Sequence, residues 1–154
     1  MGPFRARPPP PARLARGWQR PRDVATRILL VDDEDSIHFA MQTYFSVFGY
    51  SVDGARSSAE ALERLAGGSY PVVIVDLRLS KPSAQRTEPE GLGIVSRVRR
   101  DYPDTRVVVL TACDAELEPE ALRRGAHCFL QKPQPLSRLV HIVEQLSRGE
   151  SDAG

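Results

Sequence analysis

The sequence predicts a doubly wound α/β fold, in which helices cover both faces of a parallel five-stranded sheet. From Arg27 onward, short β-branched runs alternate with longer stretches of helical period, which is the pattern of consecutive βα units. The β-branched runs are continuously apolar, as expected for strands that are buried on both faces. The 154 residues suffice for one domain of ordinary size with its own core.

Five apolar runs are the predicted strands. They are residues 28–31, 51–55, 72–75, 107–110 and 128–130. No internal repeat and no second set of elements accompanies them, so a single domain is expected over residues 25–149, with a short tail at 150–154.

The helices are predicted from apolar side chains at three- and four-residue steps. These stripes are Ile37, Ala40, Met41, Tyr44 and Phe48 in the first helix, Leu92, Val95 and Val98 in the third, and Leu136, Leu139, Val140, Val143 and Leu146 in the last. The second helix begins at a capping box of Ser57 and Glu60, and the fourth is a short helix over residues 116–124. Gly49 and Gly125 are expected to end the first and fourth helices.

Residues 1 to about 24 are expected to form a disordered basic tail. Six arginines precede the first acidic residue, Asp23, and six of the thirteen prolines lie in the same segment. The few apolar groups there cannot offset the entropy of ordering the chain. The arginines could instead bind an anionic partner, but no recognition helix accompanies them, so direct contact with nucleic acid is not expected.

The composition favours a cytoplasmic protein that makes no contact with a membrane. The apolar runs are no longer than short strands, and no secretory apolar region is present. The prolines at residues 8–11 would break the amphipathic helix of an organellar transit peptide. Cys113 and Cys128 lack a metal-like spacing and are expected to be free thiols that pack as small apolar groups.

Polar residues interrupt the chain where four of the predicted strands end. They are Asp32, Asp33, Asp76, Thr111 and Lys132. In an open doubly wound sheet this edge binds ligands, so the five side chains should converge. Three carboxylates in one crevice repel one another unless a cation compensates. Oxygen ligands without His or Cys favour Mg²⁺ over zinc, and an incomplete ligand set favours it over Ca²⁺.

This set of residues indicates phosphoryl transfer. Beside a metal ion, an aspartate carboxylate can attack phosphorus, because the metal screens its charge from the phosphoryl oxygens. Lys132 would supply a second cation to those oxygens, and Thr111 a hydroxyl donor. Positioning and charge neutralisation are most of what such a reaction requires.

The strand ends resemble those of the receiver domain of bacterial response regulators in two-component signalling, over residues 27–148. The matching segments are Leu30-Val31-Asp32-Asp33-Glu34, Val73-Ile74-Val75-Asp76-Leu77, Val109-Leu110-Thr111-Ala112 and Phe129-Leu130-Gln131-Lys132-Pro133. One such segment alone is weak evidence, whereas four in this order are specific. The resemblance implies a flavodoxin-like sheet with strand order 2-1-3-4-5, as in chemotaxis regulators.

The resemblance also implies a phosphoacceptor and its metal ligands. Asp76 would be phosphorylated and would also be a ligand of Mg²⁺. Asp33 would bind the ion directly. Asp32 would bind the ion directly or through water, and the backbone carbonyl of Arg78 would be a further ligand.

A switch is implied as well. Lys132 would pair with the phosphoryl group, Thr111 would move toward it, and Phe129 would follow by changing rotamer. The shift would alter the surface of the fourth helix, the fifth strand and the fifth helix, where protein partners would dock.

The sequence departs from the family after Asp76. The family has Met-Pro where Leu79 and Ser80 stand, and its glycine comes at about the eighth position, whereas Gly91 comes fifteen residues after Asp76. The extended loop, residues 77–90, could change access to the site through Lys81 or Arg86, or it could be a neutral insertion. Arg78 and Cys113 lie two residues past Asp76 and Thr111, at positions that in receivers flank the path of an attacking water.

The favoured function is a stand-alone, single-domain switch and not an enzyme. The domain would assist its own phosphorylation and dephosphorylation. A histidine kinase or a histidine phosphotransfer protein would be the donor, and an unknown protein the downstream target. One alternative is a receiver-like interaction module that is never phosphorylated. Another is a haloacid-dehalogenase-type phosphatase, although the first strand lacks the Asp-x-Asp spacing of that class.

Overall fold

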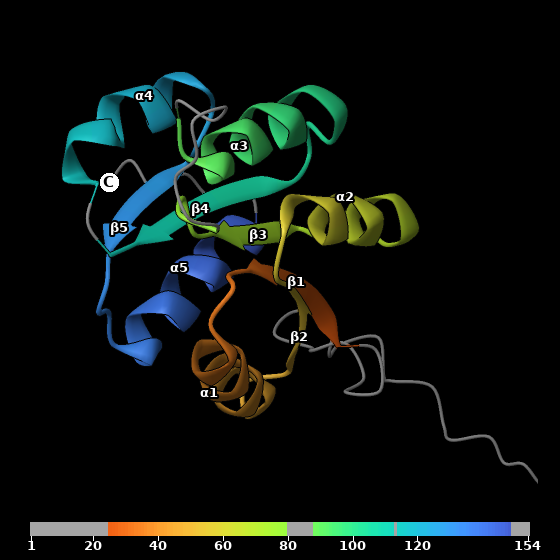
Figure 1. Cartoon of the computed structure of the whole chain (residues 1–154). Coiled ribbons are helices and arrows are strands. Elements are labelled where there is room, and N and C mark those ends of the chain that lie inside the picture. The colour runs from red at the N-terminus through yellow and green to blue at the C-terminus, as the bar shows by residue number, and fades with distance from the viewer. Residues whose placement is uncertain (1–24, 80–87, 113, 149–154) are drawn as a thin grey trace, which may run out of the picture.

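The computed structural model of the chain describes residues 25–79, 88–112 and 114–148. Its parallel sheet has the strand order β2-β1-β3-β4-β5, which confirms the predicted fold and order (Figure 1). The strands are β1 (Thr26–Val31), β2 (Tyr50–Ala55), β3 (Val72–Val75), β4 (Arg106–Thr111) and β5 (Cys128–Gln131). The helices are α1 (Asp35–Ser46), α2 (Ser58–Gly67), α3 (Glu90–Asp101), α4 (Glu118–Arg123) and α5 (Leu136–Ser147), with a 3-10 turn, η2 (Ala115–Leu117).

Some of the sequence predictions concern residues outside these ranges. They are the disordered tail at residues 1–24, the short tail at 150–154, Lys81 and Arg86 in the extended loop, and Cys113.

The sheet divides the core into two layers. Helices α1 and α5 pack on one face, in a cluster that includes Met41 and Val143. Helices α2, α3 and α4 cover the other face, where Leu65, Val95 and Ala121 pack. Figure 1 shows these two groups of helices on opposite sides of the strands. Covering both faces explains why the strands are apolar throughout rather than alternating.

The buried face of α1 consists of His38, Met41 and Phe45. The predicted stripe is therefore correct at Met41 and wrong at Phe48, which is 45% exposed. The helix ends before Phe48 is reached, and Gly49 turns the chain with a φ of +88°. Helical period does not apply beyond that end, so Phe48 does not point into the core.

The ends of α2 and α4 show how local sequence sets helix boundaries. The hydroxyl of Ser57 accepts a hydrogen bond from the N–H of Glu60 at 3.2 Å, as predicted. Glu60 reaches back to the N–H of Arg56 at 2.7 Å, one residue before the cap. The predicted fourth helix is divided into η2 and α4, because Pro119 suits only the start of a helix. Gly125, with a φ of +114°, follows its end.

Within the described ranges, no helix combines the length and the apolar character needed to cross a membrane.

Candidate functional site

Hydrogen bonds between the strands continue one residue past the strand ends and align the polar residues at one edge. The N–H of Asp32 donates to the last carbonyl of β2 at 3.0 Å, and the N–H of Asp76 donates to the carbonyl of Val31 at 2.9 Å. The N–H of Lys132 donates to the carbonyl of Thr111 at 2.8 Å. The predicted side chains therefore lie together at the carboxyl edge of the sheet, where α/β proteins bind ligands.

Three carboxylates and one ammonium group form the centre of this edge. Asp32, Asp33 and Asp76 each offer a ligand oxygen, and these oxygens lie within 4.8 Å of one another. Nζ of Lys132 lies 2.8 Å from Oδ2 of Asp32 and 3.2 Å from Oδ2 of Asp76. Asp32 and Asp76 are buried, whereas Asp33 is exposed. We call Asp32, Asp33 and Asp76 the acidic cluster.

Burial and neighbouring charges act in opposite directions on the pKa values of Asp76 and Lys132. Burial raises the pKa of the Asp76 carboxyl, and the charge of Lys132 and the N–H of Arg78 offset this only in part. Burial alone would lower the pKa of Lys132. The hydrogen bond and charge of Asp32, together with the charge of Asp76, outweigh that effect and raise the pKa. The ammonium group is therefore held in its charged form between the two carboxylates.

The acidic cluster fits a hard divalent cation. Among the described residues, Lys132 is the cation that bonds to the cluster, and one positive charge does not balance three carboxylates. The exposed side chain of Asp33 leaves the cluster open to solvent. A small number of carboxylate ligands with room for water and a phosphoryl oxygen is the arrangement that Mg²⁺ takes in proteins.

Thr111 is fully buried and does not bond to the acidic cluster. Its hydroxyl donates to Oδ2 of Asp114 at 3.3 Å. Asp114 is itself 4% exposed and binds the guanidinium of Arg78 through both carboxylate oxygens, with a shortest distance of 2.7 Å. Asp114 was not among the residues predicted from the sequence. Its position three residues after the strand-end threonine was the signal available.

His38 supports the backbone of the acidic cluster and was also missed. Its ring is 3% exposed, and Nε2 lies 2.6 Å from the carbonyl oxygen of Asp32. Because a carbonyl oxygen can only accept, Nε2 carries the hydrogen in this contact. Nδ1 is buried and has no hydrogen-bond partner in the part of the chain that the structure describes. His38 therefore fixes the backbone at Asp32.

Phe129 lies on the face of β5 that is covered by α2, α3 and α4, where it is partly buried. Val109 is its neighbour on β4. Since side chains alternate along a strand, Thr111 lies on the same face as Val109 and Phe129. The two residues predicted to form the switch are thus on one face of adjacent strands.

The extended loop returns to the site at Gly91. The N–H of Gly91 donates to the carbonyl of Leu77 at 2.9 Å. A Cβ at this position would collide with the carbonyl oxygen of Asp76 and would lie 2.6 Å from Cα of Leu77. The late glycine therefore brings the first turn of α3 against the backbone of Asp76, despite the length of the loop.

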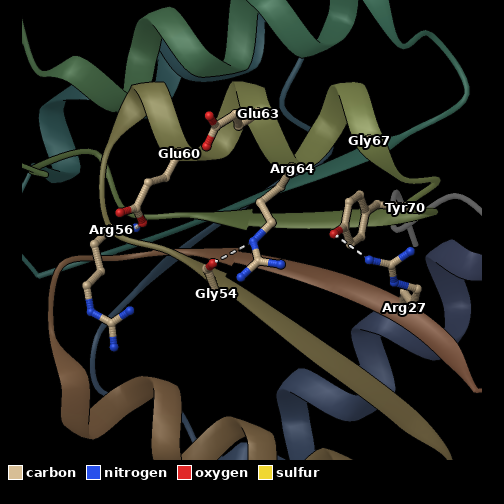
Figure 2. A pocket seen from close by; sticks show the side chains of 8 residues that line it. All are labelled: Arg27, Gly54, Arg56, Glu60, Glu63, Arg64, Gly67 and Tyr70. Atoms are coloured by element: carbon tan, nitrogen blue, oxygen red, sulfur yellow. Dashed lines mark hydrogen bonds between the residues drawn. The ribbon is translucent and has the colours of Figure 1, made fainter.

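A separate pocket of about 560 Å³ lies beside β2 and α2, and it contains none of the strand-end residues (Figure 2). Arg27, Arg56 and Arg64 line it. Each already bonds to the protein, and the acceptors are Asp53 at 2.6 Å, Asp35 at 2.6 Å and the carbonyl of Gly54 at 3.2 Å. That carbonyl lies on the side of β2 that has no neighbouring strand within the described ranges, so Arg64 protects a sheet edge.

The sequence profile of the response regulator receiver domain matches residues 28–144. Transcriptional regulatory protein DltR from Streptococcus agalactiae is 32% identical over 126 residues, which cover 81% of this chain and 53% of the relative. The chain spans between 24% and 53% of the length of the first curated relatives that it matches.

Solved structures of receivers have the same fold. A CheY-like receiver domain protein from Methanospirillum hungatei JF-1 superposes with a TM-score of 0.73 at 20% identity, over 82% of this chain and 96% of that chain. Response regulator TrrA from Thermotoga maritima, solved in complex with Mg²⁺-BeF, gives a TM-score of 0.66 at 27% identity, over 79% of this chain and 98% of that chain.

Proposed function

Because the chain belongs to the response regulator receiver domain family, we propose that it is a signalling switch that accepts a phosphoryl group on Asp76 from a phosphohistidine. One observation carries the proposal. The carboxylate of Asp76 ends β3 within the acidic cluster, 3.2 Å from Nζ of Lys132. A nucleophile, a cation and further oxygen ligands at one sheet edge are what phosphoryl transfer to a carboxylate requires.

In the transfer, an oxygen of Asp76 attacks phosphorus. A P–O bond forms while the P–N bond of the donor breaks, and its electron pair goes to the imidazole nitrogen that leaves. Lys132 neutralises charge on a phosphoryl oxygen, and Thr111 donates its hydroxyl hydrogen to another. The domain assists its own phosphorylation and dephosphorylation and has no separate substrate.

The proposal includes Mg²⁺ held by the carboxylates of Asp32, Asp33 and Asp76 and by the backbone carbonyl of Arg78. When bound, the ion neutralises charge on the carboxylates and on the incoming phosphoryl group. The spacing of the acidic cluster supports this, as does the magnesium complex of the related TrrA. His38 holds the backbone of Asp32 in place.

Phosphorylation would shift the switch residues, Thr111 and Phe129, and with them the face formed by α4, β5 and α5. Contacts with the phosphoryl group that are present in only one of two packings would drive the shift. The donor would be a histidine kinase or a histidine phosphotransfer protein, and the target an unidentified protein in the cytoplasm. Neither direct nucleic-acid binding nor a membrane is part of the proposal.

The proposal is tested by incubating the purified protein with Mg²⁺ and acetyl phosphate and following its intact mass. We expect one phosphoryl adduct on the wild type, and none on Asp76→Asn or after chelation of the metal. Asp104→Asn, which alters an exposed carboxylate before β4, should keep the adduct. An absent wild-type adduct would favour a passive interaction module, and turnover of phosphate esters a phosphatase.

A further inference from the structure

We propose that Asp114 is a positioning residue of the acceptor site, which binds Thr111 and Arg78 in the unphosphorylated protein and so opposes phosphorylation of Asp76. The inference deepens the proposed function and rests on it. Among the described residues, Asp114 is the carboxylate that accepts a hydrogen bond from the switch threonine, and it lies outside the acidic cluster.

The hydroxyl of Thr111 has a single hydrogen atom to donate. In the structure this hydrogen is directed to Oδ2 of Asp114 at 3.3 Å, in a setting where Thr111 is fully buried. A phosphoryl oxygen on Asp76 can receive it only after the bond to Asp114 is broken. Asp114 therefore competes with the phosphoryl group for the same donor.

Arg78 is engaged by Asp114 in the same way. Its backbone N–H donates to Oδ1 of Asp76 at 3.2 Å, so the residue is adjacent to the acceptor. Its guanidinium donates from Nε and from a terminal nitrogen to the carboxylate of Asp114. The guanidinium of Arg78, two residues after Asp76, is thus bound to the carboxylate of Asp114.

The ion pair is asymmetric in its burial. The side chain of Asp114 is 4% exposed and that of Arg78 is 48% exposed. A buried carboxylate that loses its partner keeps an uncompensated charge, which is costly. Movement of Arg78 or Thr111 toward a phosphoryl group would break these bonds to a buried carboxylate, so the unphosphorylated arrangement is selectively stabilised.

The backbone of Asp114 supports a specific role. Its φ is +149° with a ψ of 35°, a conformation that favours glycine. Such a conformation persists only where the surroundings hold it. Here the bonds to Thr111 and Arg78, and the bond from the N–H of Leu117 to the carbonyl of Asp114 at 2.8 Å, do so.

The test uses Asp114→Asn, which keeps the shape without the charge, and Asp114→Gly, which suits the backbone. Beryllofluoride, a phosphoryl mimic, is titrated at fixed Mg²⁺ and followed by fluorine NMR, and phosphorylation by acetyl phosphate is timed by intact mass. We expect both variants to bind the mimic roughly tenfold more tightly and to be phosphorylated faster, since a hydrogen bond to a charged group has about that effect.

Asp101→Asn is the matched control, because Asp101 binds Arg97 and Arg100 on α3. It should leave both measurements unchanged. In nitrogen NMR of the unphosphorylated protein, the Nε–H signal of Arg78 should change in the Asp114 variants alone. If both variants remain folded by thermal unfolding and bind beryllofluoride no more tightly than the wild type, the inference is wrong. If the wild type takes neither the mimic nor a phosphoryl group, the proposed function fails, and the inference with it.

Discussion

Gly91 determines how closely α3 approaches the acceptor residue. Since a Cβ there would meet the carbonyl oxygen of Asp76 and Cα of Leu77, Gly91→Ala must displace the backbone on one side. We expect it to lower the free energy of unfolding by about 1–3 kcal/mol, as overpacking does, and to slow phosphorylation of Asp76. Chemical denaturation and timed intact-mass measurements check the two effects.

Gly93→Ala is the control for that substitution. It lies in the same helix, and a Cβ there meets nothing within 4 Å. We expect it to raise stability by up to about 1 kcal/mol, because alanine favours a helix over glycine, and to leave the phosphorylation rate unchanged. Equal stability of the two variants would contradict the close approach of α3 to Asp76.

The individual site residues differ in how far they could be predicted. Asp32, Asp76 and Lys132 could be, because each interrupts an apolar run at a strand end and parallel strands share one edge. Asp114 and His38 were not predicted, and only the place of Asp114 three residues after Thr111 gave a signal for it. Asp114 is a buried carboxylate just after β4, and His38 lies on the buried face of α1 beside the apolar Met41 and Phe45.

Among the elements, α2 has an N-terminal cap that depends on one atom, the hydroxyl oxygen of Ser57. Ser57→Ala removes the acceptor of the Glu60 N–H and should cost about 1 kcal/mol of unfolding free energy. Ser58→Ala, at the next position, removes a hydroxyl that makes no hydrogen bond in the described part of the chain, and it should cost little. Denaturant midpoints of the two variants decide the matter, and equal losses would argue against the cap.

The strands were predicted more accurately than the helices. A strand buried on both faces is a continuous apolar run, so all five were located to within two residues at each end. The face of α1 was misjudged at Phe48, because apolar spacing does not reveal that the helix has already ended. The division of the fourth helix followed from Pro119, whose effect on a short helix was not considered.

The stability of the whole molecule should depend on pH through Tyr70, Asp53 and Arg27, which bond to one another away from the acidic cluster. The hydroxyl of Tyr70 donates to Asp53 at 2.6 Å, and Arg27 bonds to the same carboxylate. Burial and the hydrogen bond with Asp53 raise the pKa of Tyr70 to about 12, from 10.0. This contribution is fully present below pH 10, and it is lost as the pH rises toward 12 because the unfolded chain ionises first.

Tyr70→Phe should therefore lose less unfolding free energy than the wild type between pH 10 and pH 12. Tyr44→Phe, which removes a hydroxyl without a hydrogen bond among the described residues, should keep the wild-type dependence. Denaturant unfolding at several alkaline pH values measures both. If the unfolding free energy falls equally steeply with pH in wild type and Tyr70→Phe, the Tyr70 hydroxyl does not stabilise the fold.

For the molecule as a whole, the central claim is that its chemistry resides on Asp76. An acyl phosphate is reduced by borohydride to an alcohol, which converts a phosphorylated aspartate into homoserine. After treatment with Mg²⁺ and acetyl phosphate, reduction and peptide mass spectrometry should place homoserine at position 76 and at no other aspartate. Homoserine at another position, or none at any position in a folded protein, would contradict the account.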